Sequence, residues 1–176
     1  MVDPPPTTDR MGQVTAFTCL HVALSLAGIL SGLVVAFGML NSKRLDCWTA
    51  IFLFTTVATS VTGFLFPFHR LMPSHVVGLI SLVALSVTIF ARYGRHLAGP
   101  WRRVYAAGAV FSLYLNFFVL IAQAFAKVPA LKSTAPTQSE PPFLVAQGAA
   151  LVIFLVLGIA ATVRFRPAIS EGAVPA

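Results

Sequence analysis

Five long apolar stretches, each free of Asp, Glu, Lys and Arg, constrain this chain more than any other feature of its sequence. About 19 apolar residues in a row suffice for a helix to cross a bilayer. The stretches predict spans at about 14–40, 47–66, 75–91, 104–126 and 143–163. The third is the shortest, and four spans remain if it is re-entrant. The expected fold class is all-α: a polytopic integral membrane protein with five transmembrane helices in a bundle.

Composition excludes the main alternatives to a membrane protein. Of the 176 residues, 57% are hydrophobic and 10% are charged, whereas a soluble domain carries about a quarter charged residues. A disordered chain would need low hydrophobicity and high charge. The chain has five acidic residues, no GxSxG elbow and no glycine-rich phosphate loop. We therefore expect a protein without a catalytic centre.

The breaks between the spans support a single domain. Gly99-Pro100 is expected to open the fourth helix, because proline is well tolerated at a helix start. Ser139, Glu140 and Pro141 resemble the capped, acidic start of the fifth. The predicted organisation is a disordered N-terminus at 1–13, one transmembrane domain at 14–166 and a disordered tail at 167–176.

The positions of the basic residues predict the orientation, since short cytoplasmic loops are enriched in Lys and Arg. One side of the predicted bundle carries eight such residues and the other side four. The eight are Lys43, Arg44, Arg92, Arg95, Arg102, Arg103, Arg164 and Arg166; the four are Arg10, Arg70, Lys127 and Lys132. This distribution predicts an N-terminus outside and a C-terminus in the cytoplasm.

The net charge of +7 does not indicate a nucleic-acid partner, because the basic residues flank helices and form no single arm. The densest cluster is ARYGRHLAGPWRR at 91–103. It lies where anionic lipid headgroups are expected. We therefore predict headgroup contacts for Arg92, Arg95, Arg102 and Arg103.

Small and hydroxyl-bearing residues mark the expected helix contacts. Apolar side chains gain little from association within lipid, so close approach at small residues holds membrane helices together. Gly28 and Gly32 form a GxxxG pattern in the first span, and hydroxyls crowd the second. Close packing inside the bundle is the main interpretation, and a homodimer or another membrane protein as partner is the alternative.

Polar side chains within the spans gather in the half predicted to lie outside. Polar groups at membrane depth are costly and are functional candidates by default. Helical phase places His21 on the same face as Gly28 and Gly32, and Asn116 on the same face as Gln123. A pocket open to the periplasm is predicted from His21, Asn116, Gln123 and Gln147, with His69 and His75 at its rim. The proline-rich segment 127–142 would lie over it.

The histidines leave two interpretations open. His21, His69 and His75 fall on one side, which would permit axial ligation of a haem b or a metal site with imidazole ligands. Against this, His69 and His75 are six residues apart across a proline-bounded turn, and no carboxylate completes a ligand set. The main expectation is no cofactor, with His21 bonded to a neighbouring helix and the other two at the interface.

Several strings together resemble a family of small multi-pass inner-membrane proteins from Gram-negative bacteria. They include LHVALSLAGILSG, KRLDCWTAIF, TSVTGFLFPFH, PSHVVGLISL, ARYGRHLAGPWRRVY, LNFFVLIAQAFAKVPAL and APTQSEPPF. The resemblance covers most of the chain from His21 to Pro167. It implies a location in the bacterial inner membrane and no activity for any residue.

The function expected from the sequence is that of a small inner-membrane protein, a non-catalytic accessory or binding subunit with a polar pocket on the periplasmic side. The first alternative is a haem b or metal protein in electron transfer, which would use the outer histidines. The second is a carrier for a small uncharged solute, which would need a continuous polar path.

Overall fold

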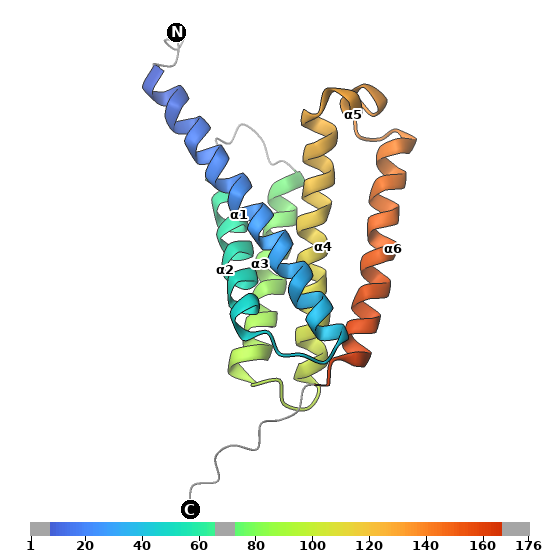
Figure 1. Cartoon of the computed structure of the whole chain (residues 1–176). Coiled ribbons are helices and arrows are strands. Elements are labelled where there is room, and N and C mark those ends of the chain that lie inside the picture. The colour runs from blue at the N-terminus through green and yellow to red at the C-terminus, as the bar shows by residue number, and fades with distance from the viewer. Residues whose placement is uncertain (1–7, 66–72, 167–176) are drawn as a thin grey trace, which may run out of the picture.

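The structure, a computed structural model, describes residues 8–65 and 73–166, and its secondary structure there is helical throughout (Figure 1). This part confirms the predicted all-α class. The helices are α1 (Thr8–Leu40), α2 (Asp46–Gly63), α3 (Pro73–Ile89), α4 (Trp101–Lys127), α5 (Pro129–Thr134) and α6 (Pro141–Arg164), and a π-helical turn, η1 (Phe90–Gly94), continues α3.

The structure describes only part of the two terminal segments that the sequence predicts to be disordered. α1 begins at Thr8, inside the segment predicted as a disordered N-terminus. Residues 1–7 and 167–176 lie outside the described residues. α4 starts directly after Gly99-Pro100 and α6 directly after Glu140, as the breaks in the sequence predict.

Four helical stretches are long and apolar enough to cross a membrane. They are Thr15–Leu40, Val76–Gly94, Trp101–Lys127 and Pro141–Arg164. The stretch that falls short is α2, which carries Asp46 and many hydroxyls; the third predicted span, extended by η1, qualifies. The chain is therefore a small multi-pass membrane protein with four candidate spans.

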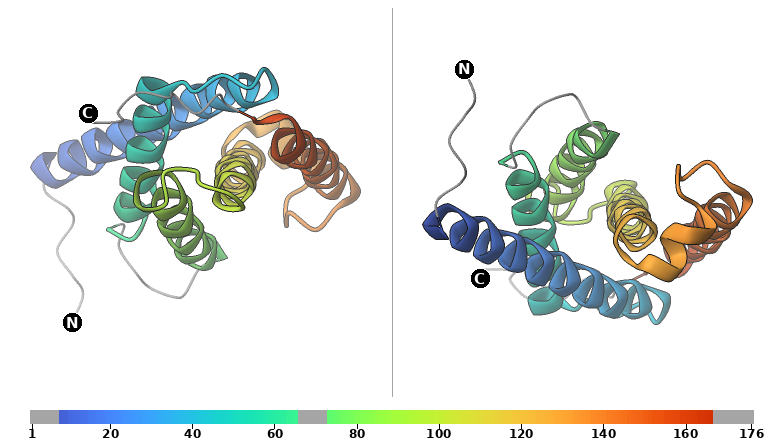
Figure 2. Two further views of the ribbon diagram at one scale, coloured as in Figure 1. Left: turned by 90° about the horizontal axis from the view of Figure 1, so that it is seen from below. Right: turned by 90° about the horizontal axis from the view of Figure 1, so that it is seen from above.

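α4 occupies the middle of the helix arrangement (Figure 2). It packs against α1, α3, α5 and α6, while α2 fills the space between α1 and α3. α6 lies at the edge, where it contacts α4 and part of α1. The described chain enters at the end that carries α5 and leaves at the end that carries η1 (Figure 1). We call these the α5 end and the η1 end.

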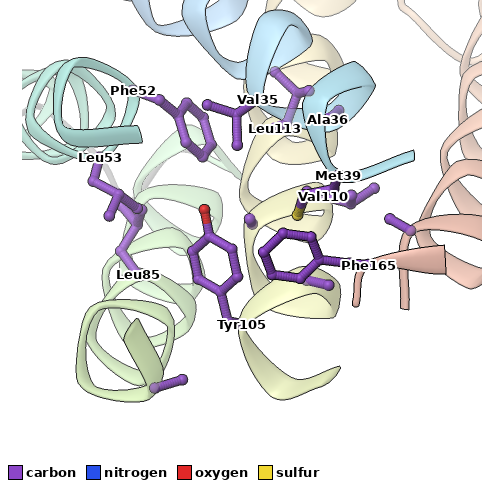
Figure 3. Packing of buried hydrophobic residues seen from close by; sticks show 14 of the residues in the cluster. Val35, Ala36, Met39, Phe52, Leu53, Leu85, Tyr105, Val110, Leu113 and Phe165 are labelled. Atoms are coloured by element: carbon purple, nitrogen blue, oxygen red, sulfur yellow. The ribbon is translucent and has the colours of Figure 1, made fainter. Parts of the chain in front are cut away.

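The main apolar core lies toward the η1 end (Figure 3). Tyr105, Phe52 and Phe165 are each 1% exposed and come from three different helices or their caps. Met39 and Leu113 complete the contact between α1 and α4. A smaller cluster of Phe125, Ala135 and Phe143 lies at the α5 end.

Glycines allow α1 to approach its neighbours closely. A Cβ atom on Gly32 would lie 2.6 Å from Leu113 Cδ1 and 2.8 Å from Phe52 Cε2. A Cβ on Gly28 would lie 3.2 Å from Thr56 Oγ1. Both distances to Gly32 are shorter than ordinary Cβ contacts, so a larger residue at position 32 would force Leu113 and Phe52 to move. The predicted packing face of the first span is confirmed.

α2 turns its polar side toward the bundle and its apolar side outward. Its buried residues include Thr49, Thr55, Thr56 and Ser60, and its exposed large side chains include Ile51, Phe54 and Val61. Most of these hydroxyls donate to backbone carbonyls one turn earlier or bond across helices, as Ser60 does to Ser81 at 3.2 Å. The polar groups of α2 are thereby largely satisfied inside the protein.

Candidate functional site

His21 lies on α1 and is half-buried against the last turn of α2. Its Nδ1 is 2.8 Å from Thr62 Oγ1. The Thr62 hydroxyl also lies 2.8 Å from the carbonyl of Ala58, one turn earlier on α2. His21 thus bonds a neighbouring helix, which is the role the main interpretation of the histidines gave it.

Asn116 is buried in the centre of the bundle. Its Nδ2 donates to Thr56 Oγ1 at 3.2 Å. The same nitrogen would lie 3.5 Å from a Cβ on Gly28. Asn116 therefore joins α4 to α2 at the point where α1 comes closest, and the two polar faces predicted from helical phase meet there in part.

Gln147 lies on the opposite flank of α4. It is buried on α6, and its Nε2 donates to the carbonyl of Phe118 at 3.1 Å. Its Oε1 is buried without a hydrogen-bond partner. Because Nε2 bonds a carbonyl, the amide cannot be reversed to satisfy Oε1. Gln147 is thus a buried side chain with an open acceptor.

The four predicted pocket residues do not come together in one cavity. Asn116 faces α2, whereas the carbonyl that Gln147 contacts is two residues further along α4, about 200° around the helix. Gln123 is exposed. α5 packs against α4, and Gln138 donates to the carbonyl of Ala122 on the same helix at 2.8 Å. These polar residues form separate contacts.

The histidine site cannot be assembled from the described part of the chain. His69 lies outside the described residues. His75 belongs to α3, but its side chain is also outside them. Among the described side chains no group of three His, Cys, Asp or Glu could hold a metal ion. The haem and metal interpretation stays a prediction.

The predicted headgroup arginines have different environments. Arg103 is exposed, and Arg95 is exposed with its guanidinium 5.5 Å from the centre of the Trp101 ring. Arg102 is half-buried and donates to the carbonyl of Phe165. Arg92 is directed inward, with 2% of its side chain exposed. A role at lipid headgroups stays a prediction, and its geometry is best suited to Arg95 and Arg103.

Arg92 belongs to a polar cluster that sequence reasoning missed. Its guanidinium bonds the Asp46 carboxylate and lies 5.1 Å from the centre of the Tyr105 ring. The Tyr105 hydroxyl is 3.2 Å from Thr49 Oγ1. The Arg92 Nε is buried without a partner. The alternating direction of the predicted spans already places Asp46 and Arg92 at the same end of the bundle. Asp46 is one of five acidic residues in the sequence, and its position near a basic cluster could have indicated an ion pair.

A groove separates α4 and α6 over the half of their length nearer the η1 end. Its volume is about 400 Å³. The side chains that line it are apolar or aromatic, apart from Thr162. They are Ala107, Val110, Phe111 and Tyr114 from α4 and Leu151, Phe154, Leu155, Gly158, Ile159 and Thr162 from α6.

No family model, curated protein or solved structure matches the chain. The assignment therefore depends on the residues and their geometry. These establish a small helical protein with four candidate membrane spans.

Proposed function

We propose that this chain is a five-span protein of the bacterial inner membrane, with its N-terminus outside and its C-terminus in the cytoplasm, that serves as a non-catalytic binding or accessory subunit. α2 is the fifth span in this proposal. The observation that carries the binding role is the open acceptor of Gln147 at the contact of α4 and α6.

The side chains of α2 support a membrane position. A spanning helix in a bundle directs polar groups toward protein and apolar groups toward lipid. Phe54 is 72% exposed and Val61 46%, whereas Thr56 is fully buried. The buried hydroxyls lower the mean hydropathy of α2, although they face other helices and would not contact lipid. With α2 as a span, five crossings separate the two described ends of the chain, in agreement with Figure 1.

The native cysteines allow the proposed orientation to be tested. Cys19 and Cys47 are both free and exposed, and Cys47 lies in the first turn of α2 at the η1 end. A C19S variant leaves Cys47 as the single thiol. A membrane-impermeant maleimide should label it in inside-out vesicles and not in spheroplasts, with C19S/C47S as the blank. Labelling in spheroplasts would reverse the orientation.

The surroundings of Gln147 support a binding role for this residue. A buried polar atom without a partner costs roughly 1–3 kcal/mol. A leucine would fill the same contact without that cost, and Phe118 would keep its helical hydrogen bond. A donor group from a ligand or partner that reaches the outer part of α6 would satisfy Oε1. The glutamine is then suited to recognition more than to packing.

A pair of measurements on Gln147→Leu tests this role. We expect the isolated variant in detergent to be more stable by about 1 kcal/mol, because the open acceptor is gone. In native membranes, a photo-crosslinking residue at the exposed position 148 should give a discrete adduct that Gln147→Leu abolishes. Gln123→Leu, an exposed amide on α4, is the matched control and should change neither result. Lower stability with an unchanged adduct pattern would assign Gln147 to packing alone.

A further inference from the structure

The groove between α4 and α6 has the length of one lipid leaflet. From Leu151 to Thr162 it follows α6 for about 16 Å at 1.5 Å per residue. Half of a hydrocarbon core of about 30 Å is about 15 Å. It runs toward the η1 end, where both helices approach the membrane surface. An occupant that enters from that surface would therefore lie along the groove through one leaflet.

The cross-section of the groove suits a single hydrocarbon chain. A volume of about 400 Å³ over about 16 Å gives about 25 Å². A helix about 10 Å wide has a cross-section of about 80 Å². A helix from a second copy or from another protein would therefore lie over the open groove without filling it. The lining side chains Phe111, Leu155 and Ile159 offer an acyl chain apolar contact on both sides.

A basic side chain, Arg103, lies near the opening of the groove at the η1 end. Arg103 lies four residues before Ala107, one of the lining residues, so it shares that face of α4. The antiparallel register is given by two contacts: Arg102 bonds the carbonyl of Phe165, and a Cβ on Gly158 would lie 3.6 Å from Val110. Arg103 therefore lies two to three residues beyond Thr162 toward the surface, about 4 Å along the helix axis. It is exposed and available to an anion.

We propose that this groove binds one acyl chain of an anionic glycerophospholipid, whose phosphate group is held by Arg103. The apolar channel supplies affinity for the chain, and the guanidinium supplies preference for an anionic headgroup through charge-assisted hydrogen bonds to phosphate oxygens. The site involves neither Gln147 nor the outer half of the bundle, so it is independent of the function proposed above.

Native mass spectrometry of the full chain in mild detergent tests the site with two probes, phosphatidylglycerol and phosphatidylethanolamine of identical acyl chains. The wild type should retain one phosphatidylglycerol, with at least a fivefold preference over phosphatidylethanolamine. Arg103→Gln should abolish the preference. Lys43→Gln, which removes an exposed cation at the same end, should keep it.

A second pair of variants tests the channel. Gly158→Leu fills the groove and should abolish retention of both lipids. Gly148→Leu adds the same side chain where a Cβ meets nothing within 4 Å, and should retain them. If Gly158→Leu does not yield a monodisperse protein, Ile159→Phe replaces it. The proposal is overturned by wild type that retains no phosphatidylglycerol, by equal losses in Lys43→Gln and Arg103→Gln, by full retention in the filled groove, or by a dimer that occupies it.

Discussion

At the η1 end, Tyr105, Phe165 and Met39 are at most 2% exposed and pack in one apolar core, which the Arg92–Asp46 pair adjoins. At the α5 end, the helices meet through single polar contacts and a small cluster around Phe143. The bundle is thus densely packed where it meets one membrane surface and more loosely joined at the other. Rigid packing supports a fold, and separate polar contacts with an unsatisfied acceptor leave room for binding.

The largest effect is expected from Tyr105→Ala. The change removes a fully buried ring, its contact with Thr49 Oγ1 and the aromatic face beside Arg92. Truncation of such a ring costs roughly 3–5 kcal/mol. Phe143→Ala, at the α5 end, should cost clearly less, because its cluster has few buried members. Reversible unfolding in mixed micelles measures both. Equal losses would remove the distinction between the ends.

A smaller effect is expected from the polar contact between Asn116 and Thr56. Hydrogen bonds between membrane helices contribute about 0.6 kcal/mol on average. A double-mutant cycle of Asn116→Ala and Thr56→Val should give a coupling of that size. Asn116→Ala paired with Val145, an exposed residue of α6, changed to Ala is the control and should show none. A coupling near zero for the first pair would show that polar contacts do not hold the middle of the bundle.

The smallest effect concerns the loop before α6. Partial desolvation raises the pKa of Glu140, but hydrogen bonds from Thr137 and Ser139 outweigh it and hold the pKa below its ordinary value of 4.5. The stabilisation is therefore complete above pH 4.5 and is lost as the pH falls through the lowered pKa. Hydrogen-exchange protection of the Thr137 and Ser139 amides, corrected for the intrinsic pH dependence of exchange, should fall in that window. In Glu140→Gln the same two amides should exchange faster at neutral pH, and their protection should no longer depend on pH in this window.

Much of the architecture could be predicted because hydropathy and helix punctuation act locally. Gly99-Pro100 and Glu140 mark helix starts through backbone chemistry that does not depend on tertiary contacts. The packing face at Gly28 and Gly32 follows from the need for small residues at close helix contacts. Four of the five predicted spans meet the length and hydropathy of a membrane helix. α2 does not, because its threonines lower its hydropathy.

The arrangement of the polar side chains could not be predicted in the same way. Depth along a span places Asn116 and Gln147 in the same half of the bundle, but it does not determine on which side of α4 each lies. Which helices are neighbours decides that, and neighbour order is a tertiary property. The sequence predicts a surface position for Arg92, and this prediction fails for a related reason. Arg92 lies in the π-helical turn η1, and its inward direction brings it to partners on two other helices, Asp46 on α2 and Tyr105 on α4.

The contacts that hold α6 in place also bear on how the protein is assembled in the membrane. Its C-terminal end is held by side chains from elsewhere: the Ser42 hydroxyl donates to the Arg164 carbonyl at 2.6 Å, and Arg102 bonds the carbonyl of Phe165. In the apolar 18-residue stretch of α6 that could cross a membrane, only 11% is buried inside the protein, against 44% of the corresponding stretches of α1 and α4. Since α6 follows the other helices in the chain, it reaches the membrane after they can meet. Its docking is then a late step of biogenesis, completed by two hydrogen bonds to partners that are already in place.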